Sequence, residues 1–212
     1  CNGYFIRLGQ ELGPERVREM AVRLGFGRAL NLADTLSTAA GQLPEAETLT
    51  SSGAFANFCF GQGELLATPI QIAAMMNTIA AGGIWREPLF LECTLDETTG
   101  EPLTALAHRG ARRVFSAQTA RALRELLASV VTEGTGHEAA PTEGTAAGKT
   151  GTAQTGQFAA GKELKNYWFA GFYPARNPRY TIVVLQDGQT GPSRTSAAIF
   201  ARVCDALDAA GE

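Results

Sequence analysis

The 212-residue sequence contains few of the residues that build metal centres or disulfide frameworks. It has four cysteines, none of them in a C-x-x-C pair, and only two histidines, His108 and His137. We therefore expect no disulfide framework and no metal site, and interpret the thiols as small buried hydrophobic groups. His137 lies in a glycine-flanked loop and is interpreted as an exposed polar residue.

Long apolar runs and an excess of positive charge are also missing. The longest apolar runs have five residues, at 72–76 and 197–201, so we expect neither a membrane-spanning helix nor a signal peptide in this sequence. With 18 basic and 21 acidic residues the net charge is −3, which argues against nucleic-acid binding. The length predicts about one domain with a sizeable core.

The first two thirds of the sequence are predicted to be mainly helical. Apolar spacing predicts one helix up to Gly13, through Phe5, Leu8 and Leu12, and a second from Pro14 to Gly25. A capping box at 68–71, with proline at the first helical position, predicts a third that ends at 82–83. A fourth is predicted from a cap at Ser116 to Gly134. Residues 27–67 show no period and are interpreted as irregular.

The remaining sequence predicts extended structure and one last helix. Residues 84–95 read as extended, 96–100 as a turn and 101–114 as a strand or loop return. Strands are predicted at 145–155, 167–173 and 180–186, the last two joined as a hairpin by the turn at 174–178. The final helix is expected to place Phe200, Val203, Cys204 and Leu207 on one face. The fold class is therefore α+β, with a mainly helical part at 1–143 and an antiparallel sheet plus helix at 144–212.

One motif, Gly148-Lys149-Thr150-Gly151-Thr152, carries most of the chemical information. A phosphate-binding loop would need glycine where the sequence has Glu143, and a buried strand where it has polar residues. The alternative is the K-T-G strand of serine acyl-transfer enzymes that act on penicillins and D-alanyl peptides. An extended peptide could add to the edge of such a strand, beside the lysine ammonium and the threonine hydroxyls.

Other segments follow in the order of one family's motifs. They are Cys1-Asn2 for the end of S-x-N, Gly61–Gly63 and Thr68–Ala73 for G-Q-G…T-P-x-Q-x-A, Ala81–Gly83 with Pro88 for the next turn, Val130–Gly136 for V-V-x-x-G-T-G, Ala147–Gln154 for A-G-K-T-G-T-A-Q, and Phe169–Pro174 for the following strand. Over residues 1 to about 205 the sequence resembles the transpeptidase domain of penicillin-binding proteins, closest to the class B, monofunctional kind.

The resemblance has one gap, the S-x-x-K motif that holds the family's nucleophilic serine. No serine of these 212 residues has lysine three positions later. We therefore expect residues 1–212 to be the C-terminal part of a single transpeptidase domain. The serine, its helix and two N-terminal strands would lie outside it, so the chain alone is expected to be inactive, with an incomplete sheet.

The resemblance implies roles for five residues. Asn2 and Lys149 would be catalytic, Asn2 by bonding the substrate amide carbonyl and Lys149 by supporting proton transfer from the serine. Thr150, Gly151 and Thr152 would bind substrate, with both threonines holding its terminal carboxylate and the Thr152 N–H donating into the oxyanion hole. Gln62, Thr68 and Gln71 are interpreted as structural. No metal or organic cofactor is implied.

The implied function is peptidoglycan cross-linking. The parent protein would act on the D-Ala-D-Ala stem peptide by serine acyl transfer, bind β-lactams, and sit membrane-anchored at the extracytoplasmic face of a bacterial cell membrane. Its fragment is expected to self-associate or to pair with the missing N-terminal portion. Two alternatives remain open from the residues: a D,D-carboxypeptidase or β-lactamase, and a non-catalytic sensor of β-lactams or muropeptides.

Overall fold

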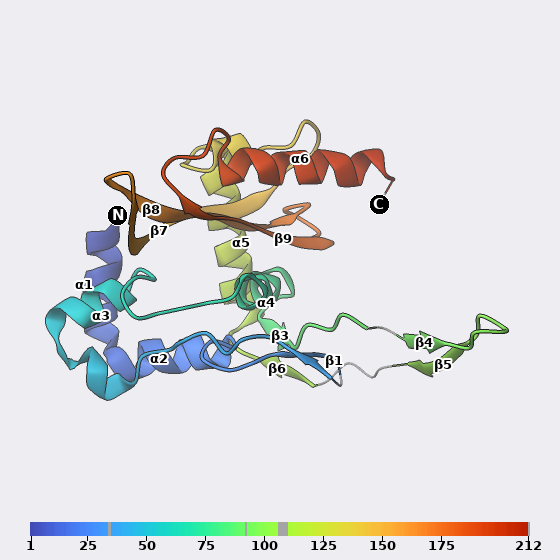
Figure 1. Ribbon diagram of the computed structural model, residues 1–212, viewed down its shortest axis with the longest axis horizontal. Helices are drawn as coiled ribbons and strands as arrows, with labels where there is room; N and C mark the ends of the chain where they lie inside the picture. Colours follow the sequence, from blue (N-terminus) through green and yellow to red (C-terminus); the bar gives the residue numbers. More distant parts are fainter. Residues whose placement is uncertain (34, 92, 106–109, 212) are drawn as a thin grey trace. The chain divides into compact units, whose positions relative to one another are not determined.

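The computed structural model describes residues 1–33, 35–91, 93–105 and 110–211, and the chain divides into two compact units (Figure 1). The first unit comprises residues 1–74 and 84–114, and the second comprises residues 75–83 and 115–212. One helix, α4 (Pro69–Ala80), belongs to both units. His108 lies outside the described residues.

The first unit consists of short helices and two-stranded antiparallel ladders. Its helical elements are α1 (Asn2–Leu12), α2 (Pro14–Arg23), the 3₁₀ helix η1 (Ala46–Thr50) and α3 (Ser52–Phe58). The ladders pair β1 (Asn31–Ala33) with β2 (Leu36–Ser37), β3 (Ile84–Arg86) with β6 (Ala111–Arg113), and β4 (Cys93–Leu95) with β5 (Pro102–Ala105).

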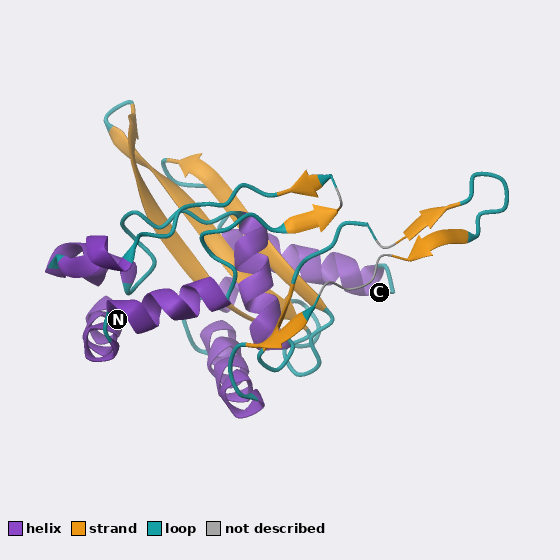
Figure 2. Ribbon diagram, turned by 90° about the horizontal axis from the view of Figure 1, so that it is seen from below, coloured by secondary structure: helices purple, strands orange, loops and turns teal. Residues whose placement is uncertain are grey.

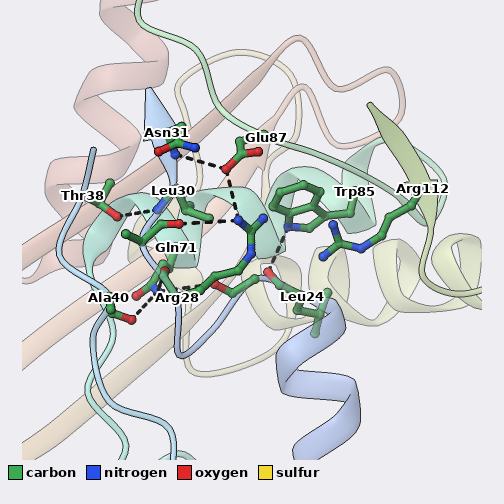
Figure 3. Close-up of polar contacts among 12 residues, drawn as sticks. Leu24, Arg28, Leu30, Asn31, Thr38, Ala40, Gln71, Trp85, Glu87 and Arg112 are labelled. Carbon is green, nitrogen blue, oxygen red and sulfur yellow. Dashed lines mark hydrogen bonds and ion pairs between the residues drawn. The ribbon is translucent and has the colours of Figure 1, made fainter. Parts of the chain in front are cut away.

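A buried glutamine, Gln71, organises the loops of the first unit (Figure 3). Its Oε1 accepts the Thr68 N–H at 2.8 Å, which confirms the predicted capping box and the structural role of both residues. Its Nε2 donates to the carbonyl oxygens of Ala40, Arg28 and Gly25 at 2.9, 3.0 and 3.4 Å. One side chain therefore satisfies backbone groups that would otherwise be buried without partners.

Trp85 of β3 is the second anchor of this unit (Figure 3). Its indole N–H donates to the Leu24 carbonyl at 3.0 Å. The guanidinium carbons of Arg112 and Arg28 lie 3.9 and 4.9 Å from the ring centroid, and Arg28 pairs with Glu87 at 3.2 Å. These contacts tie the β3–β6 ladder to the end of α2 and the loop after it.

The second unit is built on a three-stranded antiparallel sheet in the order β7-β8-β9 (Figure 2). The strands are β7 (Ala147–Ala159), β8 (Lys162–Tyr173) and β9 (Tyr180–Gln189), which confirms the three predicted strands and the hairpin between the last two. Helix α5 (Ala117–Thr132), which begins at the predicted Ser116 cap, packs against β7, and the short η2 (His137–Ala139) follows it.

Helix α6 (Ser196–Ala209) covers one face of this sheet (Figure 1). The Phe200 ring packs on Phe169 of β8 with the ring centroids 4.7 Å apart, and both side chains are fully buried. Cys204 is buried in the same cluster, whereas Val203, which the spacing places on the same helix face, is 37% exposed. The small Ala197 and Ala201 lie on the sheet side instead, because they let the helix approach closely.

Other expectations also need correction. Residues 27–67 are not wholly irregular, because they include η1 and α3, whose N-cap Ser51 accepts the Ala54 N–H at 3.2 Å. Phe55 and Phe58 of α3 pack with Leu49 in a small core. Of the four free cysteines only Cys204 is buried, so the general prediction of buried thiols was wrong.

Two predicted apolar surfaces remain accessible. The helix α1 forms as expected, but Phe5, Leu8 and Leu12 are 52, 37 and 45% exposed. The apolar run of β9 at 181–185 is typical of a fully buried central strand, whereas β9 pairs only with β8 among the described strands and is half-buried from Tyr180 to Gln186. Ile182 and Val184 pack on the α6 side.

Candidate active site

The K-T-G motif lies within strand β7, at the edge of the described sheet. Gly148 precedes it and pairs with Gly171 of β8. A Cβ atom at Gly148 would lie 2.5 Å from the Phe169 ring and 2.7 Å from the Ala170 carbonyl oxygen, so only glycine fits there. The motif is a strand and does not precede a helix, which excludes the phosphate-loop interpretation.

The Lys149 ammonium is held by oxygen atoms at the edge of β7. Nζ donates to the Thr150 hydroxyl at 2.9 Å and to the Thr150 carbonyl at 3.1 Å. It also donates to the Thr135 hydroxyl at 3.4 Å. Successive side chains of a strand leave on opposite faces, so the Lys149 side chain must bend back toward the strand to reach Thr150.

Among the described residues, no carboxylate forms an ion pair with Lys149. Each ion pair in the described part of the chain is formed by an arginine. Desolvation lowers the pKa of Lys149 below its ordinary value of 10.5. The three acceptors are neutral oxygens, so the protonated side chain keeps a net positive charge with which an anionic group can interact.

Thr135 is the member of this cluster to which the sequence assigned no role. It lies between α5 and η2, 14 residues before Lys149, and its hydroxyl is 3.2 Å from the Thr150 hydroxyl. The signal was present in the sequence, because Gly134-Thr135-Gly136 belongs to one of the quoted motifs. Spacing alone could not show that this loop reaches β7.

The remaining predicted residues occupy different places. Gly151 and Thr152 directly follow Thr150 in β7; Gly151 is half-buried and Thr152 is exposed. A Cβ atom at Gly151 would lie 3.3 Å from the Cβ atom of Trp168, which makes the site tight. Asn2 is the exposed first residue of α1 and belongs to the first unit, whereas the K-T-G strand belongs to the second.

The surroundings offer few other functional features. His137 is exposed at the start of η2, as predicted.

A cavity of about 400 Å³ on α6 is lined by none of the predicted site residues. Among the described residues, no group of three His, Cys, Asp or Glu side chains could hold a metal ion. No helix in the same residues is both long and apolar enough to cross a membrane.

Comparison with known proteins decides the family. A family model described as the penicillin binding protein transpeptidase domain matches residues 1–205. The chain belongs to this family. Among characterised relatives of this transpeptidase-domain chain, penicillin-binding protein PbpB of Mycolicibacterium smegmatis is 34% identical over 95% of the chain. Stage V sporulation protein D of Bacillus subtilis is 31% identical over 96% of it.

Solved structures agree with this assignment to the transpeptidase-domain family. Penicillin binding protein 3 of Mycobacterium tuberculosis, in complex with aztreonam, covers the whole chain with a TM-score of 0.85 and 30% identity. The D,D-transpeptidase domain of a peptidoglycan glycosyltransferase from Eggerthella lenta also covers it, with a TM-score of 0.82 and 27% identity. The chain spans about a third of the curated relatives, 33 and 31% of their lengths, and about half of the solved chains, 49 and 52%.

Proposed function

We propose that this chain is part of a class B, monofunctional peptidoglycan D,D-transpeptidase, and that its K-T-G strand forms one wall of the catalytic cleft. The single observation that carries the proposal is the Lys149–Thr150–Thr135 cluster at the free edge of β7. Relatives named peptidoglycan D,D-transpeptidase, such as PbpA of Mycolicibacterium smegmatis at 29% identity over 99% of the chain, support it.

The free edge of β7 suits an extended peptide substrate. Backbone groups at the edge of a strand can bond a stem peptide laid antiparallel or parallel to that strand. The Lys149 ammonium would attract the carboxylate of the terminal D-alanine, and the hydroxyls of Thr150 and Thr152 would accept and orient it. The same contacts would hold the carboxylate of a β-lactam.

The reaction would proceed by serine acyl transfer in the parent protein, the full-length product that contains this chain. The serine Oγ attacks the carbonyl carbon of the penultimate D-alanine, the C–N bond breaks, and the terminal D-alanine leaves as the free amine. Lys149 would support the proton transfer from the serine, Asn2 would bond the substrate amide carbonyl, and the Thr152 N–H would donate to the oxyanion. An amine of a neighbouring strand then attacks the ester and releases the serine.

The product of the acyl-enzyme separates this function from its alternatives. The parent protein is incubated with a stem pentapeptide and an amine acceptor, and the products are analysed by mass spectrometry. A cross-linked product supports the transpeptidase. A tetrapeptide as the only product identifies a carboxypeptidase. Acylation by a penicillin without conversion of the pentapeptide identifies a sensor.

Location and partners follow from the same proposal. A peptidoglycan cross-linking enzyme must act at the extracytoplasmic face of the bacterial cell membrane, where its stem peptides are, and we propose that the parent protein is anchored there. Residues 1–212 would form the C-terminal part of its single transpeptidase domain. The half-buried β9 would pair with further strands of that domain or with a second copy of the chain.

A further inference from the structure

The loop Gly134-Thr135-Gly136 is pressed onto the core of the second unit. The Gly136 N–H donates to the Val130 carbonyl at 3.0 Å. A Cβ atom at Gly136 would lie 3.0 Å from a Val130 methyl group and 3.2 Å from the Phe169 ring. A Cβ atom at Gly134 would lie 2.9 Å from the Val130 backbone. The two glycines therefore let the chain turn tightly at the end of α5. Between them, Thr135 carries the side chain that is free of this packing.

That side chain closes a triangle of polar contacts with β7. The three edges are Lys149 Nζ to Thr135 Oγ1 at 3.4 Å, Lys149 Nζ to Thr150 Oγ1 at 2.9 Å, and Thr135 Oγ1 to Thr150 Oγ1 at 3.2 Å. With the Thr150 carbonyl, the ammonium has three oxygen acceptors for its three N–H donors. Thr135 is the one of these acceptor residues that does not belong to β7.

The contact from a second element constrains Lys149 more than its own strand can. Fixing a lysine side chain at a strand edge costs much of its rotamer entropy, so the contacts with Thr150 on the same strand hold it only weakly by themselves. Thr135 is anchored by the packing of Gly136 against Val130 and Phe169. Thr135 therefore fixes the Lys149 ammonium relative to the buried core of the second unit.

We propose that Thr135 is a positioning residue for Lys149: its hydroxyl fixes the ammonium beside the Thr150 hydroxyl at the free edge of β7. The consequence for acylation rests on the proposed function, whereas the positioning itself can be measured on this chain. Thr135 acts through Lys149 and Thr150 and need not touch substrate.

The lysine content makes the positioning directly observable. The chain has three lysines, Lys149, Lys162 and Lys165, so the ¹³Cε and ¹⁵Nζ signals can be assigned by single substitutions. Thr135→Val removes the hydroxyl at nearly constant volume, Thr135→Ser keeps it, and Thr132→Val is the matched control on the exposed last residue of α5. Circular dichroism and thermal melting verify that all three variants fold.

The expected result is specific to one lysine and one hydroxyl. Thr135→Val lowers the Lys149 pKa further, because the charged form loses an acceptor, and it lowers the order parameter of the Lys149 ¹³Cε group because the side chain gains motion. Thr135→Ser restores both properties, and Thr132→Val leaves them unchanged. Unaltered Lys149 signals in a folded Thr135→Val chain would overturn the proposal.

Acylation of the parent protein tests the consequence. Thr135→Val should slow acylation by a labelled penicillin between about tenfold and a hundredfold, and Thr135→Ser should restore most of the rate. A wild-type parent that is never acylated would refute the proposed function and leave the Lys149 signals as the test of positioning. An acylating parent whose rate is unaffected by Thr135→Val would refute the role of Thr135 in the reaction.

Discussion

The Tyr173 hydroxyl of β8 donates a 2.5 Å hydrogen bond to the Asp208 carboxylate in the last turn of α6. One turn earlier on the same helix, Asp205 accepts the Thr142 N–H at 2.7 Å. The C-terminal helix is thus fastened to the sheet and to the loop before β7. The hydrogen bond from Tyr173 to the Asp208 carboxylate raises the pKa of Tyr173 to about 12, because ionisation of the tyrosine would place two negative charges together.

The first prediction concerns the pH dependence of this bond. The folded pKa of Tyr173 exceeds its ordinary value of 10, so the folded chain holds this proton more tightly than the unfolded chain. The stabilisation is complete below pH 10 and is lost as the pH rises from 10 to about 12. Tyr173→Phe should lower the free energy of unfolding by roughly 2 kcal/mol near neutral pH.

The measurement is urea unfolding of the wild type and Tyr173→Phe at several pH values up to about 11. Tyr4→Phe, at a site that is 64% exposed, is the matched control and should have little effect. The difference between the wild type and Tyr173→Phe should shrink above pH 10. A difference that stays constant across this range would contradict the assigned bond.

The second prediction concerns Gln71 at the start of α4. Gln71→Ala removes a fully buried side chain and leaves the part-buried carbonyl oxygens of Ala40 and Arg28 without their donor. The free energy of unfolding should fall by roughly 3 kcal/mol. Gln118→Ala, at an exposed glutamine in α5, should change it by less than about 0.5 kcal/mol. Equal effects in chemical denaturation would show that Gln71 does not organise these loops.

The third prediction concerns the open edge of β9. Apolar residues of this strand remain half-buried, and the strand pairs only with β8 among the described strands. The purified chain should therefore self-associate, as seen by light scattering at about 100 μM. Thr181→Lys should weaken the association, since an edge lysine opposes pairing, whereas Gln157→Lys in β7 should not. A stable wild-type monomer would show that this edge is already protected.

The fourth prediction concerns the chain without a nucleophile. Because no serine has a lysine three residues later, none is activated by an adjacent base in the S-x-x-K manner. The isolated 212-residue chain should form no covalent penicillin adduct in intact-mass analysis, while the parent protein should form one. A stoichiometric adduct on the isolated chain would reveal a nucleophile of another kind.

Local signals in the sequence identified most elements of the fold. The capping box at Thr68 and Gln71 and the cap at Ser116 predicted helix starts that the structure confirms, since each depends on residues within one turn. The helix α3 was missed because seven residues carry too little periodicity, and its stability comes from the packing of Phe55 and Phe58.

Contacts between distant segments could not be predicted in the same way. The motif marked Lys149 and Thr150, but the approach of Thr135 depends on how α5 packs against β7. The stacking of Arg112 on Trp85 depends on the β3–β6 register. The half-buried state of β9 could not be predicted because burial depends on neighbouring strands, whereas apolar content belongs to the strand itself.

The fifth prediction tests the central claim that Lys149 of the K-T-G strand serves the acyl-transfer reaction. In the parent protein, Lys149→Ala should slow acylation by a labelled penicillin by about 10², because the site loses its charged contact. The folding stability should change little, since Lys149 is an exposed residue by its overall accessibility and its contacts lie at the strand edge.

Lys162→Ala, at an exposed lysine at the start of β8, is the matched control and should acylate at the wild-type rate. The decisive measurement is therefore the acylation rate of the folded Lys149→Ala parent protein relative to the wild type and to Lys162→Ala. A selective loss of about a hundredfold is the result that we predict. A rate equal to that of the wild type would contradict the assignment of the K-T-G strand to the active site.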